Sequence, residues 1–99
     1  MRFEKSDDQM TVFLNGEIDH HNAPSIREIT DTEFIKNRPS LLILNFSEVS
    51  FMDSSGVGLV IGRYALAEKY GCKTAVEGLK DRDRKILMMS GLQNKIEFR

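Results

Sequence analysis

Two segments decide the fold: Leu41-Leu42-Ile43-Leu44-Asn45-Phe46, and then Phe51-Met52-Asp53-Ser54-Ser55-Gly56-Val57-Gly58. The first is a nearly continuous apolar run, which indicates a strand buried on both faces. From Leu59 the apolar residues follow a helical pattern as far as Tyr70, and Gly71 is a suitable helix stop. The chain therefore passes from a buried strand into a helix, with two serine hydroxyls at the junction.

The segments before this junction predict a hairpin and a helix. Residues 10–14 are rich in β-branched and apolar side chains and predict a strand that ends at Asn15-Gly16. Residues 1–5 are expected to pair with it, and residues 6–9 form the turn. A helix is expected to follow, with Asn22 as its N-cap and to stop before Pro39. Its predicted apolar side consists of Ile26, Ile29, Phe34 and Ile35.

After the junction the pattern alternates again. We expect a strand at 73–77, a helix over 81–90 that Gly91 stops, and an edge strand within 95–99. This order predicts an α/β fold with right-handed crossover helices and a mostly parallel sheet preceded by an N-terminal β-hairpin. We expect one domain over residues 1–99. Because parallel strands end at one sheet edge, residues 17–21 and 53–55 should be neighbours there.

Composition excludes several classes of function. The formal net charge is −1, with 14 basic and 15 acidic residues, which argues against a dedicated nucleic-acid binder. Cys72 is the only cysteine, so no intrachain disulfide is possible and a reducing cytoplasm is expected. No signal peptide is evident, and no apolar run approaches the ~20 residues needed to cross a membrane.

Several interpretations of the serine junction are open from the residues alone. A serine or aspartate at a helix start commonly acts as a cap, and Ser54 could serve so. A hydrolase elbow requires glycine two residues before the nucleophile, where Met52 or Asp53 stands instead, although His20 or His21 could be imagined as a base. Asp53 after a buried strand also suits a phosphorylated aspartate, with Glu17 and Asp19 as candidate Mg²⁺ ligands.

The remaining motifs favour structural interpretations. Gly56, Gly58 and Gly62 nearly match a dinucleotide fingerprint, but the third glycine is one position late, and close packing of the helix is the simpler reading. The adjacent histidines lack a further ligand, which favours an exposed loop over a metal site. Residues 80–85 are expected to be a solvated helix start of mixed charge. Met52, Met88 and Met89 are candidates for the core or for an interface, and the core is favoured.

Two motifs together resemble a known family. Residues 51–58 and the loop Gly16-Glu17-Ile18-Asp19-His20-His21 are similar to the STAS domain of bacterial anti-sigma factor antagonists. Gly62-Arg63-Tyr64 and Met89-Ser90-Gly91-Leu92 fit the same pattern, so the resemblance covers nearly the whole chain. The D-S-[ST]-G motif joined to the G-E-[LI]-D-H-H loop points to the sporulation branch of this family.

The resemblance implies a switch protein rather than an enzyme, and we expect neither a cofactor nor a metal. Family members bind an anti-sigma factor that is also an ATP-dependent serine kinase and so release the sigma factor. The kinase phosphorylates the first serine of the motif, which is Ser54 here, and a PP2C-type phosphatase removes the phosphate. The residues that the resemblance assigns to partner binding or to the lining of the site are Asp19, His20, His21, Asp53, Ser55, Gly56, Gly58 and Arg63.

Two further expectations accompany the resemblance. The alternative function is a STAS-type nucleotide-binding or small enzyme domain that uses the Asp53-Ser54 loop. Family members usually continue into another helix beyond the position of Phe98, so we expect one sheet face to be partly uncovered in this chain. A phosphate at Ser54 adds about −1.5 to −2 charge at pH 7, which a helix N-terminus tolerates.

Overall fold

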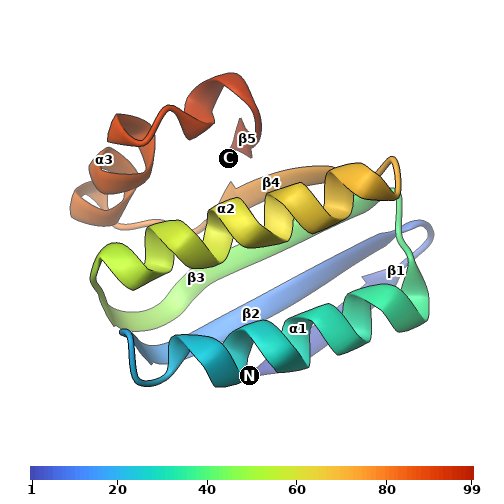
Figure 1. Ribbon diagram of the computed structural model, residues 1–99, viewed down its shortest axis with the longest axis horizontal. Helices are drawn as coiled ribbons and strands as arrows, with labels where there is room; N and C mark the ends of the chain where they lie inside the picture. Colours follow the sequence, from blue (N-terminus) through green and yellow to red (C-terminus); the bar gives the residue numbers. More distant parts are fainter.

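The computed structural model describes residues 1–99, and strands and helices alternate along the chain in the predicted order (Figure 1). The strands are β1 (Arg2–Ser6), β2 (Gln9–Ile18), β3 (Leu41–Met52), β4 (Lys73–Glu77) and β5 (Glu97–Phe98). The helices are α1 (Ala23–Asn37), α2 (Ser54–Lys69), α3 (Asp81–Met89) and a short 3₁₀ helix (Leu92–Asn94).

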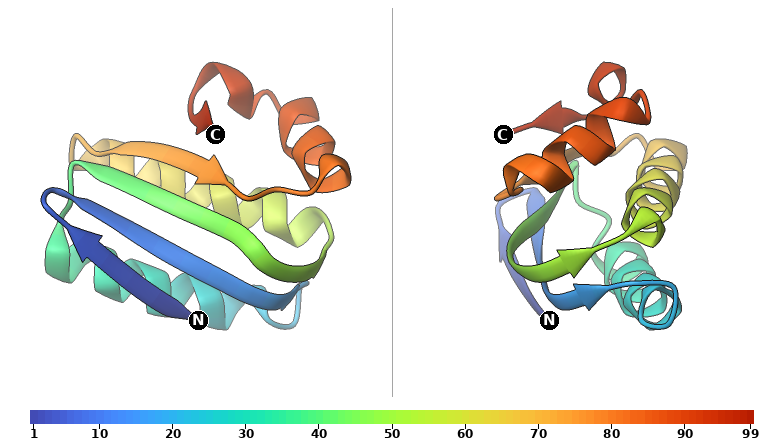
Figure 2. Two further views of the ribbon diagram at one scale, coloured as in Figure 1. Left: turned by 180° about the vertical axis from the view of Figure 1, so that it is seen from behind. Right: turned by 90° about the vertical axis from the view of Figure 1, so that its left-hand side faces the viewer.

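The five strands form one sheet in the order β1-β2-β3-β4-β5. β1 and β2 are an antiparallel hairpin, and every later neighbour is parallel. This confirms the mostly parallel sheet with an N-terminal hairpin. Helices α1 and α2 lie side by side on one face, and α3 lies beyond β4 (Figures 1 and 2). The opposite face of the sheet carries no helix (Figure 2).

Strands β2 and β3 are longer than predicted. The sequence prediction ended the first at Asn15-Gly16, but β2 continues to Ile18, and β3 continues from Phe46 to Met52. Register shifts between β2 and β3 fall at Phe13/Asn15 and at Gly16/Glu17. Gly16 has φ +75°, a conformation that glycine adopts readily and that suits a β-bulge. The Asn-Gly pair therefore bends a continuing strand instead of ending it.

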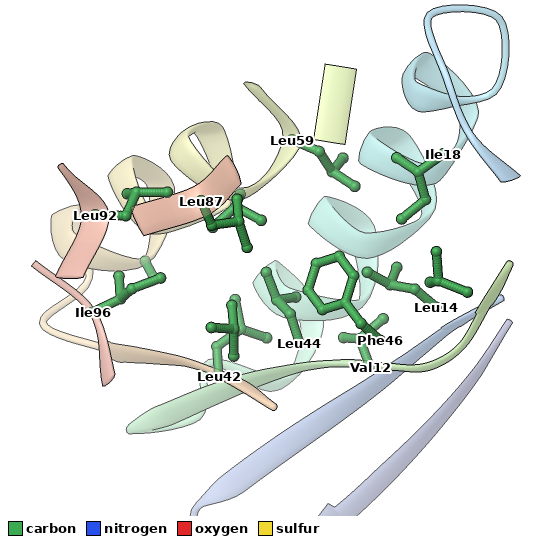
Figure 3. Close-up of a cluster of buried hydrophobic side chains, with 14 of the residues drawn as sticks. Val12, Leu14, Ile18, Leu42, Leu44, Phe46, Leu59, Leu87, Leu92 and Ile96 are labelled. Carbon is green, nitrogen blue, oxygen red and sulfur yellow. The ribbon is translucent and has the colours of Figure 1, made fainter. Parts of the chain in front are cut away.

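The core lies between the helices and the sheet. Side chains of alternate strand residues, including Val12, Leu14, Leu44 and Phe46, point toward α1 and α2 (Figure 3). Leu87, Leu92 and Ile96 close the same core beside β4. Leu42, Ile43 and Leu44 are each at most 2% exposed, so the apolar run of β3 is buried on both faces.

Some predicted core positions are wrong. In α1 the side chains at 26, 30 and 34 recur every four residues and face the sheet, so Thr30 and Phe34 are buried while Ile29 is 45% exposed and Ile35 37% exposed. Met89 is 87% exposed because it lies on the outer side of α3, whereas Met52 is fully buried and Met88 is half-buried.

Candidate functional site

The ends of β2 and β3 meet at one sheet edge, as the sequence predicts. Ile18 pairs with Met52, and the N–H of Asp53 donates to the carbonyl oxygen of Ile18 at 3.1 Å. The β2–α1 and β3–α2 loops therefore lie together at the left of Figure 1. Residues more than thirty positions apart in the sequence thus form one surface.

Asp53, and not a serine, caps α2. Its carboxylate accepts a hydrogen bond from the N–H of Ser55 at 2.8 Å, and its carbonyl oxygen accepts one from the N–H of Gly56 at 2.9 Å. The serine-cap interpretation of Ser54 is therefore wrong, because Asp53 fills that role with an extended backbone. Ser54 is the first helical residue and is exposed, whereas Ser55 is half-buried. The Ser54 hydroxyl is consequently accessible to another protein.

Asp19 shapes the neighbouring loop. One of its carboxylate oxygens accepts hydrogen bonds from the N–H groups of His21 at 3.1 Å and Asn22 at 2.9 Å. Asn22 is the N-cap residue of α1, as predicted, but its side chain makes no capping hydrogen bond; its amide group instead donates to the carbonyl oxygen of Glu17 at 3.2 Å. His20 and His21 are left exposed at the tip of this loop.

The three glycines of α2 have different roles. A Cβ atom at Gly56 would lie 2.2 Å from Cγ of Met52, so the close approach of helix and strand requires glycine there. A Cβ at Gly58 or Gly62 would meet no heavy atom within 4 Å. Close packing therefore explains Gly56 alone, and the prediction that all three glycines pack the helix against the sheet is wrong.

Gly58 and Gly62 instead line a groove between the first halves of α1 and α2. Its volume is about 480 Å³. The groove reaches the serine motif, because Ser55 forms part of its wall. The other lining residues are His20, Ala23, Pro24, Arg27, Leu59 and Arg63. The missing side chains of the two glycines thus leave space beside the serine motif.

Arg63 is buried at the wall of this groove and pairs with Asp31 of α1. Its Nε lies 2.7 Å from Oδ1 of Asp31, and Nη2 donates to Oδ2 at 3.2 Å. Burial raises the pKa of Asp31 and lowers the pKa of Arg63, and their mutual attraction only partly offsets this. This ion pair joins the two helices at the wall of the groove, so Arg63 both lines the groove and holds α2 against α1.

The charged run at 80–85 is not simply solvated. Lys80 Nζ donates to the carbonyl oxygen of Val49 at 2.5 Å, and Arg82 Nη1 donates to that of Met52 at 3.2 Å. The Asp83 side chain is only 7% exposed and lies 3.3 Å from Arg82 Nη1. Sequence reasoning missed these contacts. The available signal was the pair of cations at a helix start, where the dipole disfavours positive charge.

The outer side of α2 is uncharged near its start. Ser54, Gly58, Ile61 and Ala65 are exposed at helical spacing, and Ile61 is 43% exposed. We call these four residues the switch face. Depletion of charge with exposed apolar side chains is typical of the centre of a protein–protein interface. The switch face begins at the accessible hydroxyl of Ser54.

Other kinds of site find little support in the geometry. No three His, Cys, Asp or Glu side chains are grouped so that they could hold a metal ion. The hydrogen bonds of this loop and of the serine motif, from the N–H groups of His21 and Ser55 to Asp19 and Asp53, are made by the backbone and not by a histidine ring or a serine hydroxyl. None of the helices has the length and apolar character needed to cross a membrane.

Comparison with known proteins gives the family. The sequence pattern of the STAS domain matches residues 1–99. The chain belongs to the STAS domain family. The anti-sigma F factor antagonist of Paenibacillus polymyxa is 35% identical over 83 residues, which are 84% of this chain and 71% of that protein. The anti-sigma-B factor antagonist of Listeria monocytogenes is 30% identical over 96 residues, or 97% of this chain and 83% of that protein.

Solved STAS structures share the fold. The anti-sigma factor antagonist SpoIIAA in its unphosphorylated form superposes with a TM-score of 0.82 at 33% identity, covering 99% of this chain and 86% of that one. The phosphorylated form of the Bacillus cell fate determinant SpoIIAA gives a TM-score of 0.76 at 33% identity, covering 99% and 89%. This STAS domain therefore resembles a protein known in two states of phosphorylation.

Proposed function

We propose that this chain is an anti-sigma factor antagonist whose binding to its partner is controlled by phosphorylation of Ser54. The observation that carries the proposal is the position of Ser54: its hydroxyl is exposed, follows the Asp53 cap and begins the uncharged switch face. The antagonists of P. polymyxa and L. monocytogenes and the two SpoIIAA structures support the same assignment.

A phosphate on Ser54 acts on the contact and not on the fold. The side chain is exposed at a helix N-terminus, where the dipole and free N–H groups stabilise negative charge, so α2 stays intact. A partner surface that is complementary to a neutral hydroxyl and to the apolar Ile61 then meets about two negative charges. Binding must remove water from the phosphate, and any acidic groups of the partner repel it. A penalty of about 1–3 kcal/mol weakens binding by roughly one to two decades.

The proposed partner is an anti-sigma factor that is also a serine kinase and holds ATP or ADP. It phosphorylates Ser54, and a PP2C-type phosphatase restores the hydroxyl. Asp53 and Asp19 hold the two loops in shape, and Gly56 seats α2 against Met52. His20, His21, Ser55 and Gly58 offer exposed or half-buried surface to the partner beside Ser54, and the Arg63 ion pair fixes α1 against α2.

The sporulation branch of the family is the preferred assignment. The loop from Gly16 to His21 matches the pattern of that branch, and the SpoIIAA structures align over 99% of this chain. The cognate partner is then the anti-sigma F class of kinase. The anti-sigma-B class is the competing partner, since antagonists of that class are up to 30% identical.

The direct test is incubation with an anti-sigma F kinase and ATP, followed by mapping of the modified residue by mass spectrometry. We expect one phosphate, on Ser54. Ser54→Ala should take up none, and Ser55→Ala is the matched control that should still be modified. Phosphate uptake by Ser54→Ala at the wild-type rate would contradict the assignment of the switch residue.

A further inference from the structure

The second half of β3 has an edge without a strand partner, which side chains from the start of α3 reach. Pairing of β3 with β4 ends at Asn45 and Glu77, whereas pairing with β2 continues to Ile18 and Met52. The last residues of β3 therefore have hydrogen-bond partners in a strand on one side only. Backbone groups that lose their strand partner need another one, from water or from a side chain. The carbonyl oxygens of Val49 and Met52 on this edge accept hydrogen bonds from side chains at the start of α3.

Lys80 and Arg82 supply these hydrogen bonds. Lys80 Nζ donates to Val49 O at 2.5 Å, and Arg82 Nη1 donates to Met52 O at 3.2 Å. Hydrogen bonds from a charged donor are stronger than neutral ones. Lys80 is the N-cap residue of α3 and Arg82 lies in its first turn, where the helix dipole disfavours cations. These cations are thus unfavourable for the start of α3. Arg82 Nη1 also lies 3.3 Å from Oδ1 of Asp83 within α3, but the hydrogen bonds to Val49 and Met52 both reach β3.

Arg82 acts on the peptide unit that leads into the switch. The carbonyl of Met52 and the N–H of Asp53 belong to one peptide group, which is held from both sides. The N–H donates to Ile18 O of β2 at 3.1 Å, and the carbonyl accepts from Arg82 of α3. The residue that follows this peptide is the cap of α2, and the next is Ser54. A change in the orientation of this peptide would therefore move the Asp53 cap and the start of α2, which carries Ser54.

We infer that Arg82, with Lys80 beside it, is a positioning residue for the switch serine. The expected effect on phosphorylation rests on the proposed function. The two hydrogen bonds that hold the Met52–Asp53 peptide, from its N–H to Ile18 and to its carbonyl from Arg82, do not, and we call them the clamp. Without Arg82 the Met52–Asp53 peptide is held from one side only, and the hydroxyl spends less time in the orientation for attack on the γ-phosphate. Misorientation of a reacting group lowers the rate of the chemical step. Substrate binding by the switch face is left unchanged.

The test compares Arg82→Gln with Arg82→Lys and with Arg84→Gln as the matched control. Arg84→Gln removes the same charge from the same helix, but its guanidinium lies over the Phe98 ring, 5.4 Å from the centroid. Amide hydrogen exchange reports the clamp without a kinase. We expect exchange of the Asp53 and Ser55 N–H groups to rise about 2- to 10-fold in Arg82→Gln, the range for one net hydrogen bond. Arg82→Lys should restore protection in part, and Arg84→Gln should resemble wild type.

Kinase assays give the second readout. We expect Arg82→Gln to lower kcat roughly 3-fold or more with KM nearly unchanged, as loss of orientation predicts. Unchanged exchange in Arg82→Gln, or an equal rise in Arg84→Gln, overturns the inference. A rise in KM alone overturns it too, because it identifies Arg82 as a contact of the partner. If no variant is phosphorylated while the exchange pattern holds, the proposed function fails and the clamp stands.

Discussion

Replacement of Gly56 by alanine tests the way in which α2 is seated on the sheet. The added Cβ would lie 2.2 Å from Cγ and 2.4 Å from Sδ of Met52. Met52 is fully buried, so its side chain must repack within the core to make room. Overpacking of this kind costs about 1–3 kcal/mol, and the higher helix propensity of alanine returns about 0.5–1 kcal/mol. The net loss of unfolding free energy is about 0–2.5 kcal/mol.

Gly58→Ala is the matched control, since its Cβ meets no heavy atom within 4 Å. It carries the same gain in propensity without the clash, so the two variants should differ by about 1–3 kcal/mol in unfolding free energy. For a domain of this size each kcal/mol shifts Tm by about 4–8 °C. Urea titrations and thermal melts of both variants beside wild type measure the difference. Equal stability of Gly56→Ala and Gly58→Ala would refute the close contact of Gly56 with Met52.

Three further predictions concern the switch, its cap and the buried ion pair. Ser54→Asp should fold normally but bind the anti-sigma factor more weakly, whereas Ser54→Ala should bind it and resist inactivation by the kinase. Thermal melts and binding titrations check both variants, and added salt should recover part of the affinity lost in Ser54→Asp if repulsion between exposed charges dominates. Asp53→Ala should cost about 1 kcal/mol through loss of the bond to Ser55 N–H, and Asp53→Asn much less, as measured by urea unfolding. Burial raises the pKa of Asp31 above its value in the unfolded chain, so the folded state binds this proton more tightly. The unfolding free energy of wild type should therefore rise relative to that of Asp31→Asn as pH falls from neutral through the raised pKa. A fall over the same pH range would contradict the burial of Asp31.

The sequence predicted the fold well where one pattern acted alone. The apolar run at Leu42–Leu44 and the Asp53 junction define a buried strand that enters a helix, and the structure confirms both. The juxtaposition of Ile18 with Met52 followed from the topology. These features depend on local periodicity and on the rule that parallel strands end at one edge.

The errors arise where tertiary contacts override a local signal. Asn15-Gly16 is a strong turn signal, but pairing with β3 keeps β2 extended through a bulge at Gly16. Residues 80–85 have the composition of a solvated helix start, yet Lys80 and Arg82 find backbone carbonyls on β3, which only the fold brings near. Sequence spacing carries no record of such long-range partners.

The central claim is that phosphate on Ser54 weakens partner binding without disturbing the fold. The most direct measurement is a calorimetric titration of the anti-sigma factor kinase with the unphosphorylated protein and with the protein phosphorylated only at Ser54, together with thermal melts of both forms. We predict Kd about 5- to 150-fold weaker for the phosphorylated form, with both forms cooperatively folded. Equal Kd values for the two forms, or an unfolded phosphorylated form, would contradict the claim.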